Sequence, residues 1–284
     1  MTTATGPQGP AAAGERAPGP GRRGHRAWRV FGTLALTVTL VLGAVQTWAI
    51  AVQQRTRSEM SYPVAVTGVR LDTGNATVRI RPGRQGQVVV RQYLNWMVRM
   101  PVVSALFEQD RLDVRMRCAQ VVPISDLGCG AVIELDVPPG VSVTGKLSNG
   151  SIDVAGVAGE INLISTSGEV ALTDVSGPVT VRTTSGSVRG RRLSSPSVNA
   201  AATSGYLELG FASAPQVVDI GMTSGSVVLG LPRGSRYDFD GGASPRVRGS
   251  IDTTLADRSS PNKIRVSVSS GSVSVFAKDA STDD

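Results

Sequence analysis

The fold is decided by residues 161–207, which read INLISTSGEVALTDVSGPVTVRTTSGSVRGRRLSSPSVNAAATSGYL. A short unit recurs in this stretch: Thr-Ser-Gly, then a variable residue and an aliphatic one. The same unit, with small variations, is centred on six glycines of the chain: Gly150, Gly168, Gly186, Gly205, Gly225 and Gly271. The first five of them are 18, 18, 19 and 20 residues apart. Such a constant spacing indicates a structural repeat.

Each repeat predicts two short strands and two turns, because alternating apolar and polar residues lie between the glycines. Glycine supplies the positive φ that a tight turn needs, and Ser and Thr bond local backbone groups. A single coil cannot bury its own apolar side chains, so successive coils must stack around one narrow core. We therefore expect an all-β protein, a β-solenoid with coils of 18–20 residues.

The competing fold is a β-sandwich of regular hairpins, which also has short strands joined by glycine turns. Recurrence of the same turn residues favours the solenoid, which we place at residues 148–276 with a disordered tail at 277–284. Residues 62–147 are strand-rich but less regular, and we expect them to form the first coils and a cap that covers unpaired strand edges. Within them, residues 92–108 are the least strand-like, and are expected to cover the cap or to face a membrane.

The N-terminal part does not have a globular composition. Residues 1–29 are rich in Gly, Pro, Ala and Arg, which predicts a disordered basic tail. Residues 30–52 carry no charge over 23 positions, enough for a helix to cross a bilayer. Five arginines precede this segment, so the tail is expected in the cytoplasm and the larger part outside it. Residues 53–61 are expected to be a linker.

Two alternatives to a transmembrane helix remain for residues 30–52. The segment could be a buried core helix, although its length and its flanking arginines argue against this. The small residues Ala49 and Ala51 have the spacing of a signal-peptidase site, so cleavage after Ala51 would release a secreted protein. Both the membrane-anchored and the cleaved form place the β-domain outside the cytoplasm.

Cys118 and Cys129 are the two cysteines of the chain. In an exported protein, an even number of cysteines suggests a disulfide that closes a short loop. A metal site is the alternative, but two thiols without further His or Cys ligands do not complete a tetrahedral zinc shell. The sequence therefore predicts a disulfide and no metal site.

Composition argues against several classes of function. Outside residues 1–52 there are 24 basic and 21 acidic side chains, a balance without a nucleic-acid footprint. The single histidine, His25, lies in the tail, so Ser-His and Cys-His catalytic sites are not expected. No Gly-rich phosphate loop leads from a strand into a helix, and we expect no cofactor.

Three weaker candidate sites have simpler explanations. Asp238 and Asp240 precede two glycines and could bind calcium, although a plain turn explains them better. The basic cluster at residues 189–192 could contact an anionic wall polymer or lipid headgroups, although a solvated turn accounts for it. Four acids could lie on neighbouring coils and form a glycosidase pair, but scattered acids are usual at strand ends: Asp153, Glu169, Asp174 and Glu208.

The repeated units, together with the turn Val137-Pro138-Pro139-Gly140-Val141, resemble the DUF4097 family, bacterial proteins of β-strand repeats described as candidate adhesins. The resemblance covers residues 62–276. A basic tail followed by one membrane segment is similar to members from high-GC Gram-positive bacteria. The resemblance implies an adhesive or envelope role, and it carries over no catalytic, metal or cofactor residues.

We therefore expect a non-enzymatic module that binds a cell-envelope polymer or a surface protein and contacts the bilayer through residues 30–52. The alternative is an accessory or sensor subunit whose helix binds a membrane regulatory partner, with Gly43, Gln46 and Thr47 available for helix contact. An enzyme acting on wall polymers is the third and weakest hypothesis.

Overall fold

The computed structural model describes residues 31–32, 34–41, 43, 54–96, 100–118, 129–240 and 247–278. The chain forms two compact units, Met1–Val52 and Gln53–Asp284. The disorder predicted for residues 1–29 and the cleavage point after Ala51 lie outside the described residues. So does most of the tail predicted at 277–284, of which the last strand includes the first two residues.

In the first unit, the described residues between positions 31 and 43 are helical. Phe31, Leu34, Leu36 and Leu40 are each at least 60% exposed. Two hydroxyls of this helix bond back to its own carbonyls, Thr37 to Leu34 at 2.9 Å and Thr39 to Ala35 at 2.8 Å. Within the described part of the chain, no helix is both long and apolar enough to span a bilayer.

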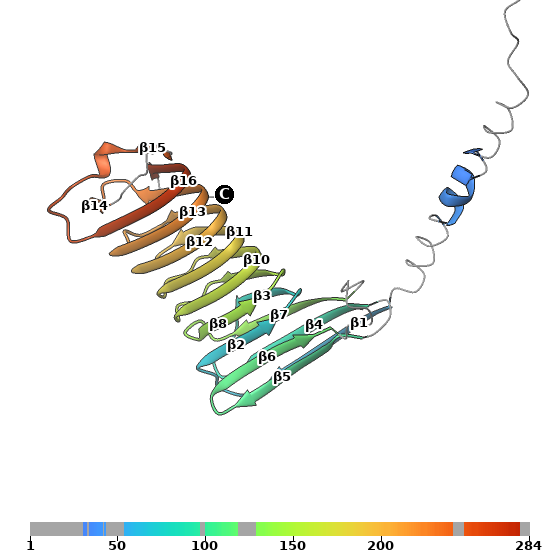
Figure 1. The fold of residues 1–284 in the computed structure, drawn as a ribbon. Coiled ribbons are helices and arrows are strands. Elements are labelled where there is room, and N and C mark those ends of the chain that lie inside the picture. The colour runs from blue at the N-terminus through green and yellow to red at the C-terminus, as the bar shows by residue number, and fades with distance from the viewer. Residues whose placement is uncertain are drawn as a thin grey trace, which may run out of the picture. The chain divides into compact units, whose positions relative to one another are not determined.

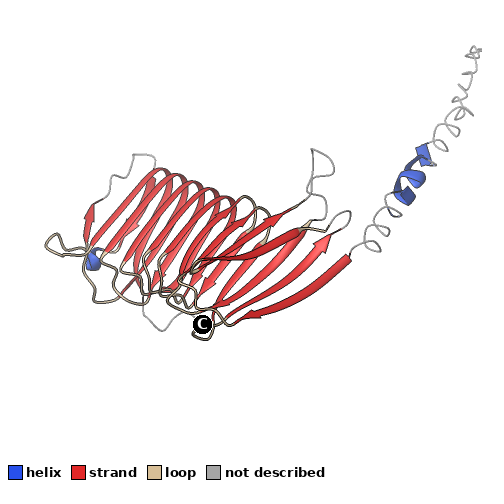
Figure 2. Cartoon of the chain, turned by 90° about the horizontal axis from the view of Figure 1, so that it is seen from below, coloured by secondary structure: helices blue, strands red, loops and turns tan. Residues whose placement is uncertain are grey.

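The second unit consists of strands stacked side by side in a long regular array (Figures 1 and 2). We call this array the rack, and each coil of the chain within it a rung. Its described elements are β1 (Gln54–Tyr62), β2 (Gly68–Thr73), β3 (Thr77–Pro82), β4 (Val88–Trp96), β5 (Val102–Glu108), β6 (Arg111–Arg117), β7 (Gly130–Val137), β8 (Ser142–Leu147), β9 (Ser151–Ala155), β10 (Ile161–Thr173), β11 (Val179–Leu193), β12 (Ser197–Phe211), β13 (Val217–Pro232), β14 (Asp238–Asp240), β15 (Val247–Ile251), the 3-10 turn η1 (Thr253–Leu255) and β16 (Lys263–Lys278).

The rungs form two layers. The first sheet has the order β5-β6-β2-β8, continues with the first halves of β10, β11, β12, β13 and β16, and ends with β14. The second sheet has the order β1-β4-β7-β3-β9, continues with the second halves of the same long strands, and ends with β15. Neighbouring long strands are parallel, which excludes the sandwich of hairpins, since hairpin strands are antiparallel. The all-β, solenoid-like repeat is confirmed.

Each long strand bends once and so belongs to both sheets. In β10, Ile161, Leu163 and Ser165 are buried, but beyond the bend the buried positions are Val170 and Leu172. The alternation shifts phase at the Ser-Gly step because the bend turns the inner face from one sheet to the other. The repeat is therefore one strand of 13–16 residues with a bend, and not the two short strands with a tight turn that the sequence predicted.

The bend is built from a column of stacked glycines. Gly168, Gly186, Gly205, Gly225 and Gly271 have φ values from +135° to +150°, a range that L-residues other than glycine rarely adopt. A Cβ added to any of them would lie 1.7–2.2 Å from the carbonyl oxygen of the glycine one rung below. At Gly150, which lies between β8 and β9, an added Cβ would lie 2.1 Å from the carbonyl oxygen of Ala76. We call these six residues the glycine column.

The core is one continuous cluster between the two sheets. It begins at Val66 and extends to Val275, and nearly all of its members are Val, Leu, Ile or Ala on the inward face of a strand. Since every rung contributes only a few side chains, each rung depends on its two neighbours for burial.

Both ends of the rack are interleaved. The first coil of the chain, β2 and β3, lies between β6–β7 and β8–β9. At the other end the last strand, β16, lies between β13 and the pair β14 and β15. At the N-terminal end, the antiparallel strands β5, β4 and β1 complete the sheets.

Two sequence predictions for the N-terminal end are wrong. Residues 53–61 are not a linker, because nearly all of them belong to β1, an edge strand held on β4 by ladder pairing and by an ion pair between Glu59 and Arg91. Residues 92–108, expected to be the least strand-like, contain the end of β4 and all of β5. Leu94 is buried, and Trp96 and Phe107 pack against the core, Phe107 also against Tyr62, whereas Val102 and Leu106 are exposed.

The predicted disulfide is confirmed. Cys118 and Cys129 are bonded, with their Cα atoms 6.1 Å apart. The bond joins the end of β6 to the start of β7 and links two residues that are 11 positions apart in the sequence. It thereby links the first sheet to the second at the N-terminal end of the rack.

Replacing both cysteines by serine is expected to lower the free energy of unfolding by about 3 kcal/mol, because the unfolded chain regains the freedom of the open loop. Chemical denaturation of the oxidised protein and the double variant measures this difference. Reduction of the wild-type protein should reproduce it. A wild-type protein in which both thiols are labelled without reductant would contradict the bond.

Candidate binding surface

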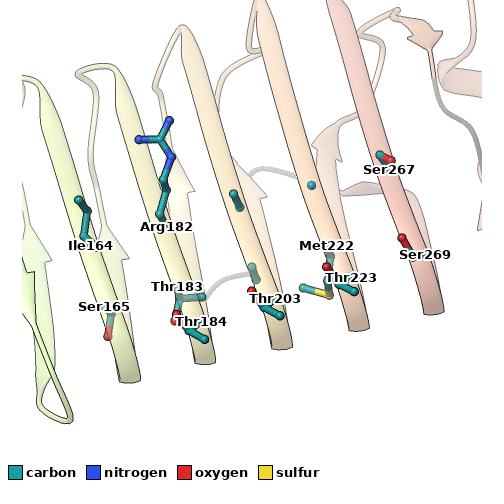
Figure 3. Close-up of a pocket in the computed structure, with 13 residues that line it drawn as sticks. Ile164, Ser165, Arg182, Thr183, Thr184, Thr203, Met222, Thr223, Ser267 and Ser269 are labelled. Carbon is teal, nitrogen blue, oxygen red and sulfur yellow. The ribbon is translucent and has the colours of Figure 1, made fainter.

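A shallow groove lies on the outer face of the first sheet, next to the bend (Figure 3). Its volume is about 510 Å³, and it runs across the strands, from β10 to β16. Two rows of outward side chains form its walls, and the buried row between them forms its floor. The lining residues are Ile164, Ser165, Arg182, Thr183, Thr184, Ala201, Ala202, Thr203, Gly221, Met222, Thr223, Ser267 and Ser269.

One wall is a row of hydroxyl groups. Thr184, Thr203, Thr223 and Ser269 follow one another across neighbouring strands (Figure 3), each directly before a serine of the bend that is in register with the next. All four side chains are exposed. None of their hydroxyls has a hydrogen-bond partner among the described residues. The wall therefore offers a line of unused donors and acceptors.

The other wall is lower in its middle. Ile164, Arg182, Ala201, Gly221 and Ser267 occupy equivalent positions on successive strands. Ile164 is 43% exposed at one end of the groove, whereas Ala201 and Gly221 project little or nothing above the sheet. The groove is widest where these two small residues lie side by side.

The groove has little net charge. Arg182 is the one ionisable side chain among the lining residues. In the next outward row, Asp219 is paired with Arg265 at 3.8 Å. Arg265 is also bonded to Asp240 at 3.0 Å. A ligand of this groove would therefore meet mainly hydroxyl groups.

The outer face of the second sheet differs, since its charges pair with one another near the N-terminal end. Arg91 bonds both Glu59, at 3.2 Å, and Asp136, at 2.8 Å. Farther along the sheet, Arg79 bonds Glu134 at 3.0 Å and Arg81 bonds Asp153 at 2.7 Å. These side chains stabilise neighbouring strands and leave little charge for a ligand.

The basic cluster at residues 189–192 is also largely neutralised. Arg189 forms an ion pair with Glu169, and Arg192 donates from Nε to Asp174 at 2.7 Å. Arg192 holds the pKa of Asp174 below its usual value. The cluster thus connects adjacent rungs, which disfavours the hypothesis that it contacts an anionic polymer.

The four acids considered for a glycosidase pair have protein partners. Arg81, Arg189 and Arg192 bond Asp153, Glu169 and Asp174. Glu208 accepts a hydrogen bond from the hydroxyl of Tyr206 at 3.2 Å. A glycosidase needs one carboxyl group with a raised pKa as its general acid, and the pKa of Asp174 is shifted in the opposite direction.

Asp238 and Asp240, the calcium candidates, do not begin a turn. They lie in strand β14 and bond to strand β16, Asp238 to Lys263 at 3.2 Å and Asp240 to Arg265 at 3.0 Å. The two glycines that follow lie outside the described residues. Nowhere in the described ranges do three His, Cys, Asp or Glu side chains come close enough to hold a metal ion.

Sequence reasoning identified the glycine column but missed the groove. The threonine of each repeated unit was explained only as a turn residue, whereas the structure places it on an exposed row. A signal was available: Ala201 and Gly221 each lie two residues before that threonine, where outward positions usually carry larger side chains.

Residues 140–276 match a family model described as Toastrack DUF4097. The match covers just under half of the chain and includes the long strands β10 to β13 and β16 up to residue 276. It confirms the expected resemblance over the repeats. No curated protein matches the sequence.

Solved structures with a similarity to this chain are distant. A candidate cell adhesion protein from Clostridium sporogenes is 12% identical, with a TM-score of 0.36, over 78% of this chain and 100% of the other. A candidate adhesin from Bacteroides fragilis is 12% identical, with a TM-score of 0.41, over 78% and 97%. A candidate lipid-binding protein from Parabacteroides distasonis is 10% identical, with a TM-score of 0.36, over 78% and 97%. Scores of this size carry no argument about function.

Proposed function

We propose that the chain is a non-enzymatic binding module that is anchored in the cell membrane of a high-GC Gram-positive bacterium and presents its rack to the cell envelope. The observation that carries the proposal is the open groove on the outer face of the first sheet, with its row of unpaired hydroxyls. A flat face built on a continuous core holds these groups at fixed spacing. Such a face suits binding to an extended polymer or to a surface protein.

The anchor would be the uncharged segment 30–52. Its described helical residues expose large apolar side chains, which a bilayer would cover. The internal bonds of Thr37 and Thr39 satisfy hydroxyls that find no water partner in lipid. The arginines before the segment favour a cytoplasmic N-terminus, and the disulfide suits the oxidising exterior.

The proposal is tested by crosslinking in intact cells. Tagged full-length protein is compared with residues 53–284 exported by a foreign signal peptide, and the captured molecules are identified. We expect wall polymer or a surface protein with both forms, because the rack alone binds. A membrane protein captured only by the full-length form would contradict the proposal and support the sensor subunit. Fractionation shows whether full-length protein remains in the membrane or is released after cleavage near Ala51.

A further inference from the structure

Gly221 is a glycine that the fold does not require. It lies inside β13, in unbroken register with Ala201 on one side and Ser267 on the other. Its φ is not in the positive range, and a Cβ added to it would have no atom within 4 Å. A methyl group could therefore be added at this position without steric conflict.

Several other glycines in the strands have structural reasons. None of the six glycines of the column leaves space for a side chain, and five of them also have positive φ. At Gly145, an added Cβ would lie 2.8 Å from the side chain of Leu163, and at Gly190 it would lie 2.6 Å from that of Leu193. Since glycine inside a strand weakens it, a strand glycine commonly marks a bulge, a bend or the close approach of a ligand. Gly221 lies at neither a bulge nor a bend, and no other backbone lies within 4 Å of an added Cβ. Close approach of a ligand is the explanation that we pursue.

The position of Gly221 agrees with that explanation. It forms the lowest part of the groove wall, beside Ala201 and opposite the hydroxyl of Thr223. Neighbouring strands are about 4.8 Å apart, so the groove from β10 to β16 spans about 19 Å. A ligand that fills it must be elongated and must lie across the strands.

The chemistry of the groove indicates the class of ligand. Backbone groups of the long strands are used in the parallel ladders, so an extended peptide would find no backbone to pair with here. The hydroxyl row can both donate and accept, as the hydroxyls of a sugar do. With Arg182 as the single ionisable lining residue, the groove offers little to a polyanion.

We propose that this groove binds a neutral polysaccharide chain, which runs along the rack and approaches the sheet most closely at Gly221. The inference rests on the proposed function and adds its site and ligand class. Recognition occurs through hydrogen bonds to Thr203, Thr223 and Ser269, because aromatic side chains, on which sugar rings often stack, are absent from the lining.

The test is retention of the full-length protein, kept in mild detergent, on insoluble cellulose and chitin. Gly221→Gln places a long side chain in the groove, starting from a Cβ that meets no atom within 4 Å, and Ala171→Gln adds the same side chain to the outer face of the second sheet. We expect Gly221→Gln to weaken retention about tenfold or more, a loss of roughly 1.4 kcal/mol. Ala171→Gln should bind like the wild type. The double variant Thr203→Val and Thr223→Val, which keeps the shape, should bind as weakly as Gly221→Gln.

Several results would overturn the inference. Equal retention of Gly221→Gln and wild type would place binding elsewhere and leave the proposed function intact. Failure of the wild type to bind either polymer, or retention only on anionic wall polymer that salt abolishes, would exclude this ligand class. The crosslinking result would then decide the proposed function. If the wild type is dimeric and Gly221→Gln is monomeric, a second copy occupies the groove.

Discussion

Gly186→Ala is expected to lower the free energy of unfolding by about 4 kcal/mol or more, the range of the most damaging single substitutions. The new methyl group would lie 2.2 Å from the carbonyl oxygen of Gly168, and alanine is strained at a φ of +150°. Since the glycines are stacked, relief at one rung would displace the rungs on both sides. Chemical denaturation, or the yield of soluble protein if none folds, measures the loss.

The matched control is Gly221→Ala, another glycine-to-alanine change within the long strands. Its methyl group meets open space, so we expect stability to be unchanged or slightly increased. If both variants lose the same stability, the steric explanation of the glycine column is wrong. A loss below about 1 kcal/mol at Gly186 would also contradict it.

Truncation after Asn262 is expected to abolish folding, because it removes β16 from between β13 and the pair β14 and β15. Ile264, Val268 and Val275 are buried on β16. Burial of each is worth about 1.5–3 kcal/mol, so the three together approach the total stability of a domain, about 5–15 kcal/mol. The edge of β13 would in addition be open to aggregation.

Far-ultraviolet circular dichroism and resistance to proteolysis follow the truncation. Truncation after Lys278 is the control, because it keeps β16 complete. We expect this shorter deletion to leave the thermal midpoint unchanged. A folded, protease-resistant protein ending at Asn262 would show that β14 and β15 can pair without β16.

The sequence was informative wherever a local rule repeats. The regular spacing of Gly168, Gly186 and Gly205 predicts parallel rungs, and two cysteines in a chain expected to be exported predict one bond. Whether the strand ends or bends at these glycines depends on its backbone hydrogen bonds with the neighbouring strands. The sequence of a single repeat does not reveal these bonds. The residues of β1 were not predicted as a strand, because their partners on β4, such as Arg91, lie far away in the sequence.

The candidate groove was harder to predict because the residues that distinguish it from the rest of the sheet are small. Gly221 and Ala201 carry no chemical group that identifies a site. Their meaning depends on knowing that they face outward, are adjacent and lie beside the hydroxyl row. The interleaved ends also escaped prediction, since no residue of β2 or β16 marks its place between strands that are distant in the sequence.

The interleaved ends determine how such a protein can change in length. A coil added after β16 would separate β16 from its partners β14 and β15. A coil added before β2 would disturb the pairing of β6 with β2. Between β10 and β13, by contrast, the glycines of the bend pair with one another from rung to rung, and the register shifts only at a bulge of β11 between Gly190 and Leu193. A tandem duplication of one such coil could be inserted there without altering either end. Evolution can therefore lengthen this binding face in steps of one repeat, and each step adds one more threonine to the row.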